Sequence, residues 1–199
     1  MKRILAAVVA CVCAGVGGPA LAQLAPYAGV DLGYGHVEYA PNAVLPNDAG
    51  GQGFAPGIFG GIEYGMGPRL SLTGELDWAM TNFKGGQRAG GRVVDHEIHM
   101  PINMKVSMGY RFRQTTLSAG LGIGRASIET TDSLTAATVK ESANGTSLLL
   151  GFRRDLAQRL FVRGEYARTN YGSVNFITGN AAQIAVSAEV FRVGLGRRF

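Results

Sequence analysis

The sequence predicts an all-β protein, a closed eight-stranded antiparallel up-and-down β-barrel that crosses a membrane with its strands. Three observations lead to this prediction. Eight segments alternate apolar and polar residues with a period of two. The connections between them alternate between tight turns and long polar segments. The chain begins with a segment typical of export signals.

The first element is the N-terminal segment 1–22, MKRILAAVVACVCAGVGGPALA, which predicts a cleaved secretory signal peptide. Two basic residues precede an apolar run over 4–16, and Ala-Leu-Ala at 20–22 matches the small-x-small cleavage pattern. The apolar run is too short to cross a bilayer as a helix. We therefore expect a mature domain over residues 23–199 that consists of the barrel.

Composition excludes several classes of protein. Both cysteines, Cys11 and Cys13, lie in the predicted signal peptide, so the mature chain has no disulfide framework, thiol nucleophile or cysteine-based metal site. Removing two of the 19 basic residues leaves 17 against 14 acidic ones, a net charge of +3 without a basic run, which argues against a nucleic-acid partner. At 46% hydrophobic and 17% charged, the chain is not of disordered composition.

Strict alternation is clearest over residues 98–112, where large apolar side chains occupy every second position and polar ones the positions between. The segment is longer than the usual strand of a soluble protein. Residues 70–81 repeat the pattern with Leu, Trp and Met on one face. The other predicted strands are 26–38, 54–66, 115–128, 145–154, 160–171 and 183–199.

Two irregularities are predicted within these strands. In the last strand the apolar residues change from even to odd positions, and a β-bulge at Val190-Phe191 would reconcile the two halves. Pro101 lacks a donor for the hydrogen-bond ladder, which predicts a bulge or a water-bridged gap there.

The connections fall into two kinds. Tight turns are predicted at 67–69, 113–114 and 155–158. Long loops rich in Gly, Asn, Asp and Thr are predicted at 39–53, 82–95, 129–144 and 172–182. Short turns at one end and long loops at the other are typical of bacterial outer-membrane barrels.

A soluble sandwich or lipocalin-like barrel is the alternative, because it also has alternating strands. The polar face of this sequence, however, consists mainly of Gly, Ser and Thr with single charges, which suits the narrow lumen of a small barrel. The other face carries Met, Leu, Trp and Tyr, which suit contact with lipid. The composition of the two faces therefore favours the membrane barrel.

The two ends of the mature chain carry a resemblance to a known family. The opening PYAGVDLGYG at 26–35 and the terminal VGLGRRF at 193–199 resemble the small porin-like family that includes opacity proteins and the membrane domain of outer membrane protein A. The resemblance implies that Phe199 is a C-terminal signal for the barrel assembly machinery. It also implies periplasmic termini and tight turns, extracellular long loops, and outer-membrane lipids and lipopolysaccharide as surroundings. Arg197 departs from the family, which often has an aromatic or apolar residue there.

Charged residues on the polar face are expected to form a network in or at the rim of the lumen. An isolated charge there carries a large desolvation cost, so these groups must pair. A salt-bridged network that fixes the register is favoured over a gated ion path. At the periplasmic end a cluster of arginines indicates either contact with phospholipid headgroups or solvated strand ends. The lumen network comprises Asp31, Glu63, Glu75, Asp77, Glu97, Lys105, Arg111, Arg153, Arg163, Glu165, Glu189 and Arg192.

The segment HEIHMP, residues 96–101, first suggests a metal site, but in a strand His96 and His99 lie on opposite faces. We expect His99 to point into the lumen with Glu97, and His96 to lie near the outer rim. A catalytic set of His96, Ser127 and Asp95 is conceivable, yet the His-x-Ser motif of lipid A deacylases is absent. We therefore predict no metal, no cofactor and no catalytic residue.

The predicted function is that of a surface protein. Loops on a rigid barrel are where binding resides, so an adhesin-type or envelope-integrity role is expected, with host surfaces, phage or lipopolysaccharide as ligands of the four long loops. Lys84, Arg88 and Arg92 are candidates for contact with lipopolysaccharide phosphates. A small low-conductance channel and a lipid A-modifying enzyme are the alternatives.

Overall fold

The computed structural model describes residues 24–40, 49–89, 92–133, 137–156, 159–178 and 180–199; the predicted signal peptide lies outside them. All regular elements in these ranges are strands. The described residues include no helix that is long and apolar enough to cross a membrane. The strands are β1 (Leu24–Tyr39), β2 (Ala49–Gly65), β3 (Leu70–Ala79), β4 (Asn82–Ala89), β5 (Arg92–Phe112), β6 (Thr115–Asp132), β7 (Ala137–Asp155), β8 (Leu160–Thr178) and β9 (Asn180–Arg198).

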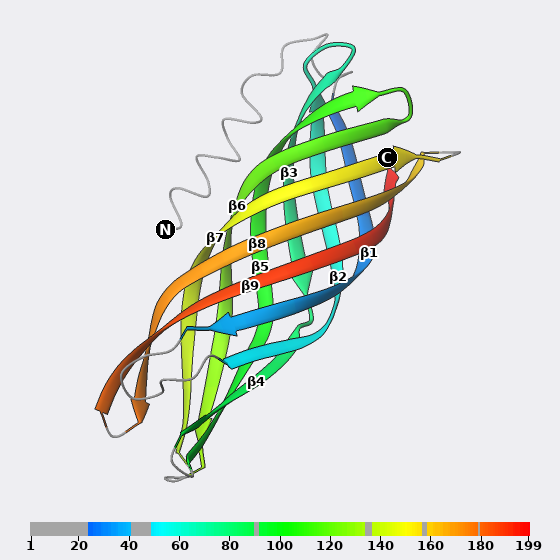
Figure 1. The fold of residues 1–199 in the computed structure, drawn as a ribbon. Helices are drawn as coiled ribbons and strands as arrows, with labels where there is room; N and C mark the ends of the chain where they lie inside the picture. The colour runs from blue at the N-terminus through cyan, green and yellow to red at the C-terminus, as the bar shows by residue number, and fades with distance from the viewer. Residues whose placement is uncertain (1–23, 41–48, 90–91, 134–136, 157–158, 179) are drawn as a thin grey trace.

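The sheet closes on itself, because β1 pairs antiparallel with both β2 and β9. The strands β3 and β4 are separated by Met80 and Thr81, and both pair with β2 and β5, so they share one position in the wall. The result is the predicted closed eight-stranded antiparallel barrel, which is elongated, with strands oblique to its long axis (Figure 1).

One end of the barrel, here called the turn end, carries the tight connections between strands. The backbone N–H of Met66 donates to the carbonyl of Leu70 at 2.9 Å across the β2–β3 turn. Arg113 and Arg159 adopt φ values of 56° and 70° in the other two turns. The N–H of Phe199 donates to the carbonyl of Pro26 at 2.9 Å, so both ends of the described barrel meet at the turn end.

At the other end, most of the predicted long loops are strand. The segment 82–95 holds β4 and the start of β5, β6 runs to Asp132 before β7 begins at Ala137, and β8 runs to Thr178 before β9 begins at Asn180. The prediction of loops over these ranges was wrong. The strands continue there with the polarity of their two faces exchanged, which lowers the contrast that identifies a membrane strand.

The predicted bulges have opposite outcomes. Pairing between β5 and β6 shifts register between His99 and Ile102, which confirms the irregularity predicted around Pro101. The bulge predicted at Val190-Phe191 was wrong, because β9 pairs in continuous register with β1 through both residues. A further shift lies between Asn170 and Gly172 in β8, where Gly172 has a φ of 70°.

A belt of apolar side chains, here called the membrane band, covers the outside of the barrel next to the turn end. On β5 it runs from Ile102 to Phe112, which matches the length that a tilted strand needs to cross a bilayer. On β9 it includes Phe191, Val193 and Leu195. The outward-facing side chains are apolar because they face lipid hydrocarbon.

Beyond the membrane band the strands form a second part of the barrel, here called the extension. The boundary between the membrane band and the extension lies at Tyr34, Ile102, Ile123, Tyr166 and Phe191, beyond which most outward-facing side chains are polar. Inside the extension lies a buried apolar cluster. It comprises Val37, Tyr39, Ala55, Ala79, Phe83, Val94, Ile98, Ala126, Ile128, Ala143, Tyr171, Val186, Ala188 and Val190.

Candidate functional site

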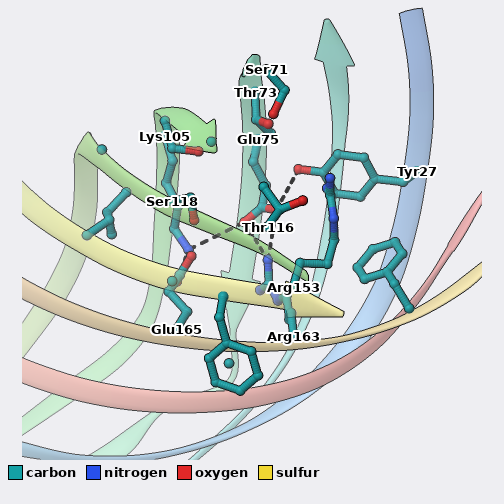
Figure 2. A pocket seen from close by; sticks show the side chains of 18 residues that line it. Tyr27, Ser71, Thr73, Glu75, Lys105, Thr116, Ser118, Arg153, Arg163 and Glu165 are labelled. Atoms are coloured by element: carbon teal, nitrogen blue, oxygen red, sulfur yellow. Dashed lines mark hydrogen bonds and ion pairs between the residues drawn. The ribbon is translucent and has the colours of Figure 1, made fainter. Parts of the chain in front are cut away.

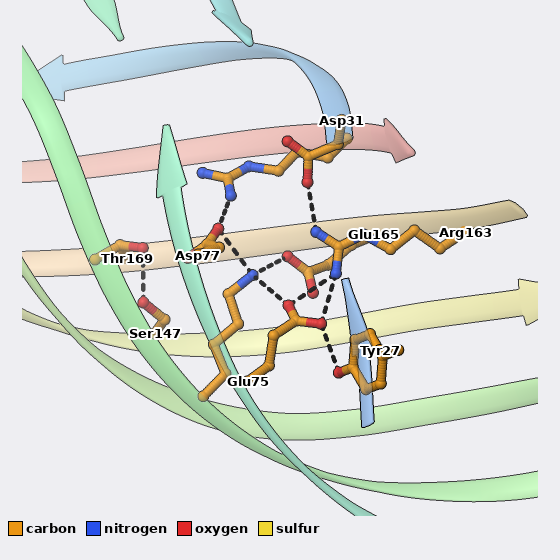
Figure 3. Close-up of polar contacts among 10 residues, drawn as sticks. Tyr27, Asp31, Glu75, Asp77, Ser147, Arg163, Glu165 and Thr169 are labelled. Carbon is orange, nitrogen blue, oxygen red and sulfur yellow. Dashed lines mark hydrogen bonds and ion pairs between the residues drawn. The ribbon is translucent and has the colours of Figure 1, made fainter. Parts of the chain in front are cut away.

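The centre of the lumen is organised by Arg163 of β8. Its Nη1 donates to both carboxylate oxygens of Glu75 at 2.7 Å, and its Nη2 pairs with Asp31 (Figure 3). The guanidinium carbon lies 3.4 Å from the ring centroid of Phe59, and the Tyr27 hydroxyl donates to Glu75 at 2.8 Å. Strands far apart in sequence are thus joined across the lumen by one buried cation.

Lys105 of β5 forms a second centre beside it. Its Nζ lies 2.5 Å from Glu165, 3.1 Å from Asp77 and 3.5 Å from Glu75. Arg192 of β9 also pairs with Asp77. We call this group the charge layer: Asp31, Glu75, Asp77, Lys105, Arg163, Glu165 and Arg192.

A second group of charges, the mouth cluster, closes the lumen at the turn end. Glu63 pairs with Arg153, and its carboxylate lies 3.3 Å from Arg198 Nε and 3.8 Å from Arg111. Asp155 lies 2.8 Å from Arg198 Nη1. The Arg111 side chain is 43% exposed, so it lies at the opening rather than inside.

The charge layer separates two cavities. A polar cavity of about 60 Å³ on the turn-end side is lined by Tyr27, Glu75, Lys105, Arg153 and other residues shown in Figure 2. A smaller cavity of about 20 Å³ lies toward the extension, beneath Phe83 and Ile98. Lys105 lines both, so the paired charges lie between a polar vestibule and an apolar interior.

Two residues predicted for the lumen face outward, and their assignment is corrected. Glu97 lies on the outer wall 3.6 Å from Lys84, because the bulge after His99 turns its part of β5 around. Glu189 pairs with Arg168 at 3.4 Å on the outer wall, because β9 keeps its even positions inward without a bulge. The other ten predicted residues lie in the charge layer or in the mouth cluster.

The two histidines of HEIHMP also exchange places relative to the prediction. His96 is 1% exposed inside the extension, stacked on Tyr39 with ring centroids 4.6 Å apart, and its Nδ1 lies 3.0 Å from Thr130 Oγ1. Burial lowers the pKa of His96 to about 4, against the opposing effect of the nearby Asp95 carboxylate. His99 lies outside instead, its ring nitrogens 3.9 Å from Glu97 and 3.8 Å from Glu129.

The conceivable catalytic set does not assemble. His96 faces the interior of the extension, whereas Asp95 and Ser127 alternate with buried residues and face the outer wall. The barrel wall therefore separates the histidine from the serine. Among the described residues there is also no group of three or more His, Cys, Asp or Glu side chains that would hold a metal ion.

The outer wall of the extension carries a row of charges that crosses four strands. Lys84, Glu97, Glu129 and Lys140 are direct cross-strand partners in register, and His99 lies between the two carboxylates. Glu129 is 3.5 Å from Lys140. Sequence reasoning missed this row because these residues were assigned to loops or to the lumen; the continued alternation of Ile98 and Ile128 with charged neighbours was the available signal.

A hollow of about 550 Å³ lies in this wall beside the charged row. It is lined by Lys84, Glu97 and Glu129 and by Gly86, which has no side chain on this outer face. A second hollow, of about 520 Å³, opens where β1, β8 and β9 meet. Its lining includes His36, Glu38, Arg168, Asn170 and Ser187.

Comparison with known proteins gives a family match. The family model described as the outer membrane protein beta-barrel domain matches residues 4–199. A search of curated protein sequences finds no match.

Solved structures resemble the fold. Neisserial surface protein A is similar with a TM-score of 0.55 at 13% identity, over 87% of this chain and 97% of that chain. The attachment invasion locus protein Ail of Yersinia pestis is similar with a TM-score of 0.50 at 12% identity, over 87% and 98%. A complex of Ail with the heparin analogue sucrose octasulfate gives 0.51 at 12% identity, over 87% and 99%.

Proposed function

Because the chain belongs to the outer membrane β-barrel family and lies in the bacterial outer membrane, we propose that it is a surface protein whose extension binds ligands outside the cell. The observation that carries this proposal is the extension itself. Its strands rise beyond the membrane band around a packed apolar interior. The turn end is then periplasmic, as the family resemblance implies.

Packing makes the extension a fixed surface. Tyr39, Phe83, Ile98 and Ile128 are at most 1% exposed inside it, and ladder hydrogen bonds join every neighbouring pair of strands around them. A surface held by a core loses little conformational entropy when it binds a ligand. This supports recognition by the strand walls in addition to loop tips.

Exposed basic side chains on the outer wall of the extension favour an anionic ligand that contacts them individually. The side chains of Lys84, Lys140 and Arg168 are 67%, 63% and 60% exposed. Each contacts a carboxylate only at 3.4 to 3.6 Å on the surface, and such exposed pairs are weak. They are therefore available to sulfate or phosphate groups of host glycans or of lipopolysaccharide. The crystallised complex of Ail with a heparin analogue supports the same chemistry for this fold.

The test compares whole cells that display the wild type or a triple variant, Lys84→Gln, Lys140→Gln and Arg168→Gln, on immobilised heparin and on lipopolysaccharide. We expect the variant to lose at least about tenfold in binding to one of them. Glu38→Gln is the matched control, because it removes an exposed charge of the opposite sign, and it should retain binding. Equal binding by wild type and triple variant to both surfaces would contradict the proposal.

A channel is the second candidate, and the packing of the lumen counts against it. The charge layer and the apolar interior of the extension lie in series along the lumen. We expect no steady ohmic current from the wild type in a planar bilayer. Stepwise ohmic current would favour the channel, and altered lipid A masses on deletion of the gene would favour an enzyme.

A further inference from the structure

We infer that exposed arginines at the turn end form a binding surface for the phosphate groups of anionic glycerophospholipids. This arginine girdle comes from the three tight turns and the adjoining ends of β7 and β9, and it is independent of ligand binding by the extension. Its members are Arg69, Arg113, Arg154, Arg159 and Arg197, all with exposed side chains.

The arginines at this end divide sharply by partner. Arg111, Arg153 and Arg198 pair with the carboxylates of the mouth cluster. No member of the girdle forms an ion pair within the described part of the chain. Arg69 donates to the Tyr110 hydroxyl at 3.1 Å, and the Arg113 guanidinium lies 5.6 Å from the ring centroid of Phe112.

No side-chain carboxylate on the outer wall of the described barrel neutralises the girdle. In the described ranges, the side-chain carboxylates near the turn end belong to Glu63 and Asp155, and both are engaged in the mouth cluster. The outward-facing carboxylates all lie in the extension, at the opposite end: Glu38, Asp95, Glu97, Glu129 and Glu189. The girdle therefore has no side-chain anion of its own, and its guanidinium groups are available to an anion from outside the chain.

The depth of the girdle fits the headgroup layer of a bilayer. Arg154 faces outward two residues beyond the exposed Phe152, or about 7 Å farther along β7. Arg197 faces outward between Leu195 and Phe199 on β9. Arginine stems pack along apolar surface while the charged head reaches the polar layer, so these guanidinium groups lie at the level of lipid phosphates.

Residue choice supports a phosphate ligand. No lysine lies at this end of the described chain, and arginine is the side chain whose planar fork holds phosphate in a bidentate manner. Arg113 and Arg159 also adopt φ values of 56° and 70°, a left-handed conformation that glycine or asparagine adopts at lower cost. Arginine is thus present at two positions where the backbone disfavours it.

The register groups four members of the girdle into two pairs. Arg154 is the cross-strand partner of Thr115, two residues from Arg113. Arg197 is the partner of Leu160, next to Arg159. Because each pair of arginines comes from neighbouring backbone positions, we expect each pair to bind one lipid phosphate at this part of the rim.

The experiment uses the folded mature protein incubated with an equimolar mixture of phosphatidylglycerol and phosphatidylethanolamine, followed by native mass spectrometry of the retained lipid. We expect the wild type to retain phosphatidylglycerol over phosphatidylethanolamine by roughly fivefold or more, since one arginine near an anionic surface contributes about that factor. Changing Arg113, Arg154, Arg159 and Arg197 to Gln should bring the ratio close to one. A variant with the same four arginines changed to lysine should keep part of the preference for phosphatidylglycerol. It tests the inference even if the glutamine variant does not fold.

Arg111→Gln is the matched control, because it removes an arginine of the same end that is already paired with Glu63 and Asp155. Its lipid ratio should equal that of the wild type. The inference is overturned if the glutamine variant and the wild type retain the two lipids in the same ratio. It is also overturned if equimolar lipid A, or millimolar inorganic phosphate, displaces phosphatidylglycerol from the wild type, because the ligand would then be a different source of phosphate.

Discussion

The membrane band and the extension are built from the same strands but obey opposite rules of polarity. On β9, Phe191 is 53% exposed to the outside while Arg192 is 3% exposed in the lumen. Only two residues earlier, Glu189 is on the outer wall and Ala188 and Val190 are inside. From Ala188 to Phe191 the pairing of β9 with both of its neighbours continues without a register shift.

The surroundings, and not the strand itself, therefore determine which face is apolar. Lipid outside the band requires apolar side chains there and leaves the narrow lumen to charges that must pair with one another. Water outside the extension requires polar side chains there and favours an apolar interior. The barrel therefore has two parts. The part inside the membrane band has a core of paired charges, and the extension has a hydrophobic core.

Disrupting the charge layer should destabilise the protein most. Arg163→Leu leaves Asp31 and Glu75 buried without their main cationic partner. Removing one member of a buried pair typically costs about 3–5 kcal/mol, so we expect a loss of that order in the free energy of unfolding. Urea unfolding from lipid vesicles, followed by gel mobility without boiling, measures it.

Arg168→Leu is the matched control in the extension. Arg168 lies on β8, like Arg163, and pairs with Glu189, its cross-strand partner on β9. Its side chain, however, is 60% exposed on the outer wall. Exposed pairs contribute up to about 1 kcal/mol, so this variant should unfold within that margin of the wild type. Similar losses of unfolding free energy for Arg163→Leu and Arg168→Leu would contradict the proposed difference between the charge layer and the outer wall of the extension.

Sequence patterning was sufficient for the membrane band. Strict alternation from Ile102 to Phe112 identified the strand, its lipid face and its inward Lys105, because both environments differ strongly in polarity. Strand number, closure and the tight turns followed from the same periodicity. The charge layer was foreseeable as a set, since paired charges are what a narrow lumen tolerates.

The extension was not foreseeable by the same rule. If each strand keeps one apolar face, the change of the apolar residues from even to odd positions at Val190-Phe191 predicts a bulge. The polarity of the two faces exchanges there instead, and the backbone continues in register. The irregularity at Pro101 is predictable, and it reverses the faces of the preceding residues, so that His96 lies inside and His99 outside. Which partners meet across the lumen depends on barrel stagger, which a single sequence does not specify.

Acid is expected to weaken the extension through His96. Its folded pKa of about 4 lies below the ordinary value of 6.5, so the unfolded chain binds a proton more readily than the folded one. Stability is therefore complete above pH 6.5 and declines as the pH falls toward 4, by about 3 kcal/mol in total. Urea unfolding at a series of pH values measures this decline. His96→Gln should flatten it, and the control His36→Gln, at a histidine that is 48% exposed, should leave it as in the wild type.

The smallest difference in the free energy of unfolding is expected between variants of two isoleucines on β5, one on each side of the bulge. Ile98 is 1% exposed inside the extension, whereas Ile102 is 54% exposed on the membrane band. Ile98→Ala loses transfer free energy and leaves a cavity in a packed core, for a total of about 2–4 kcal/mol. Ile102→Ala leaves no cavity, because lipid chains fill the space, and should cost about 1–2 kcal/mol. Urea unfolding in vesicles of matched lipid composition compares the two, and a larger loss at Ile102 would contradict the assignment of the extension as a water-exposed barrel with its own core.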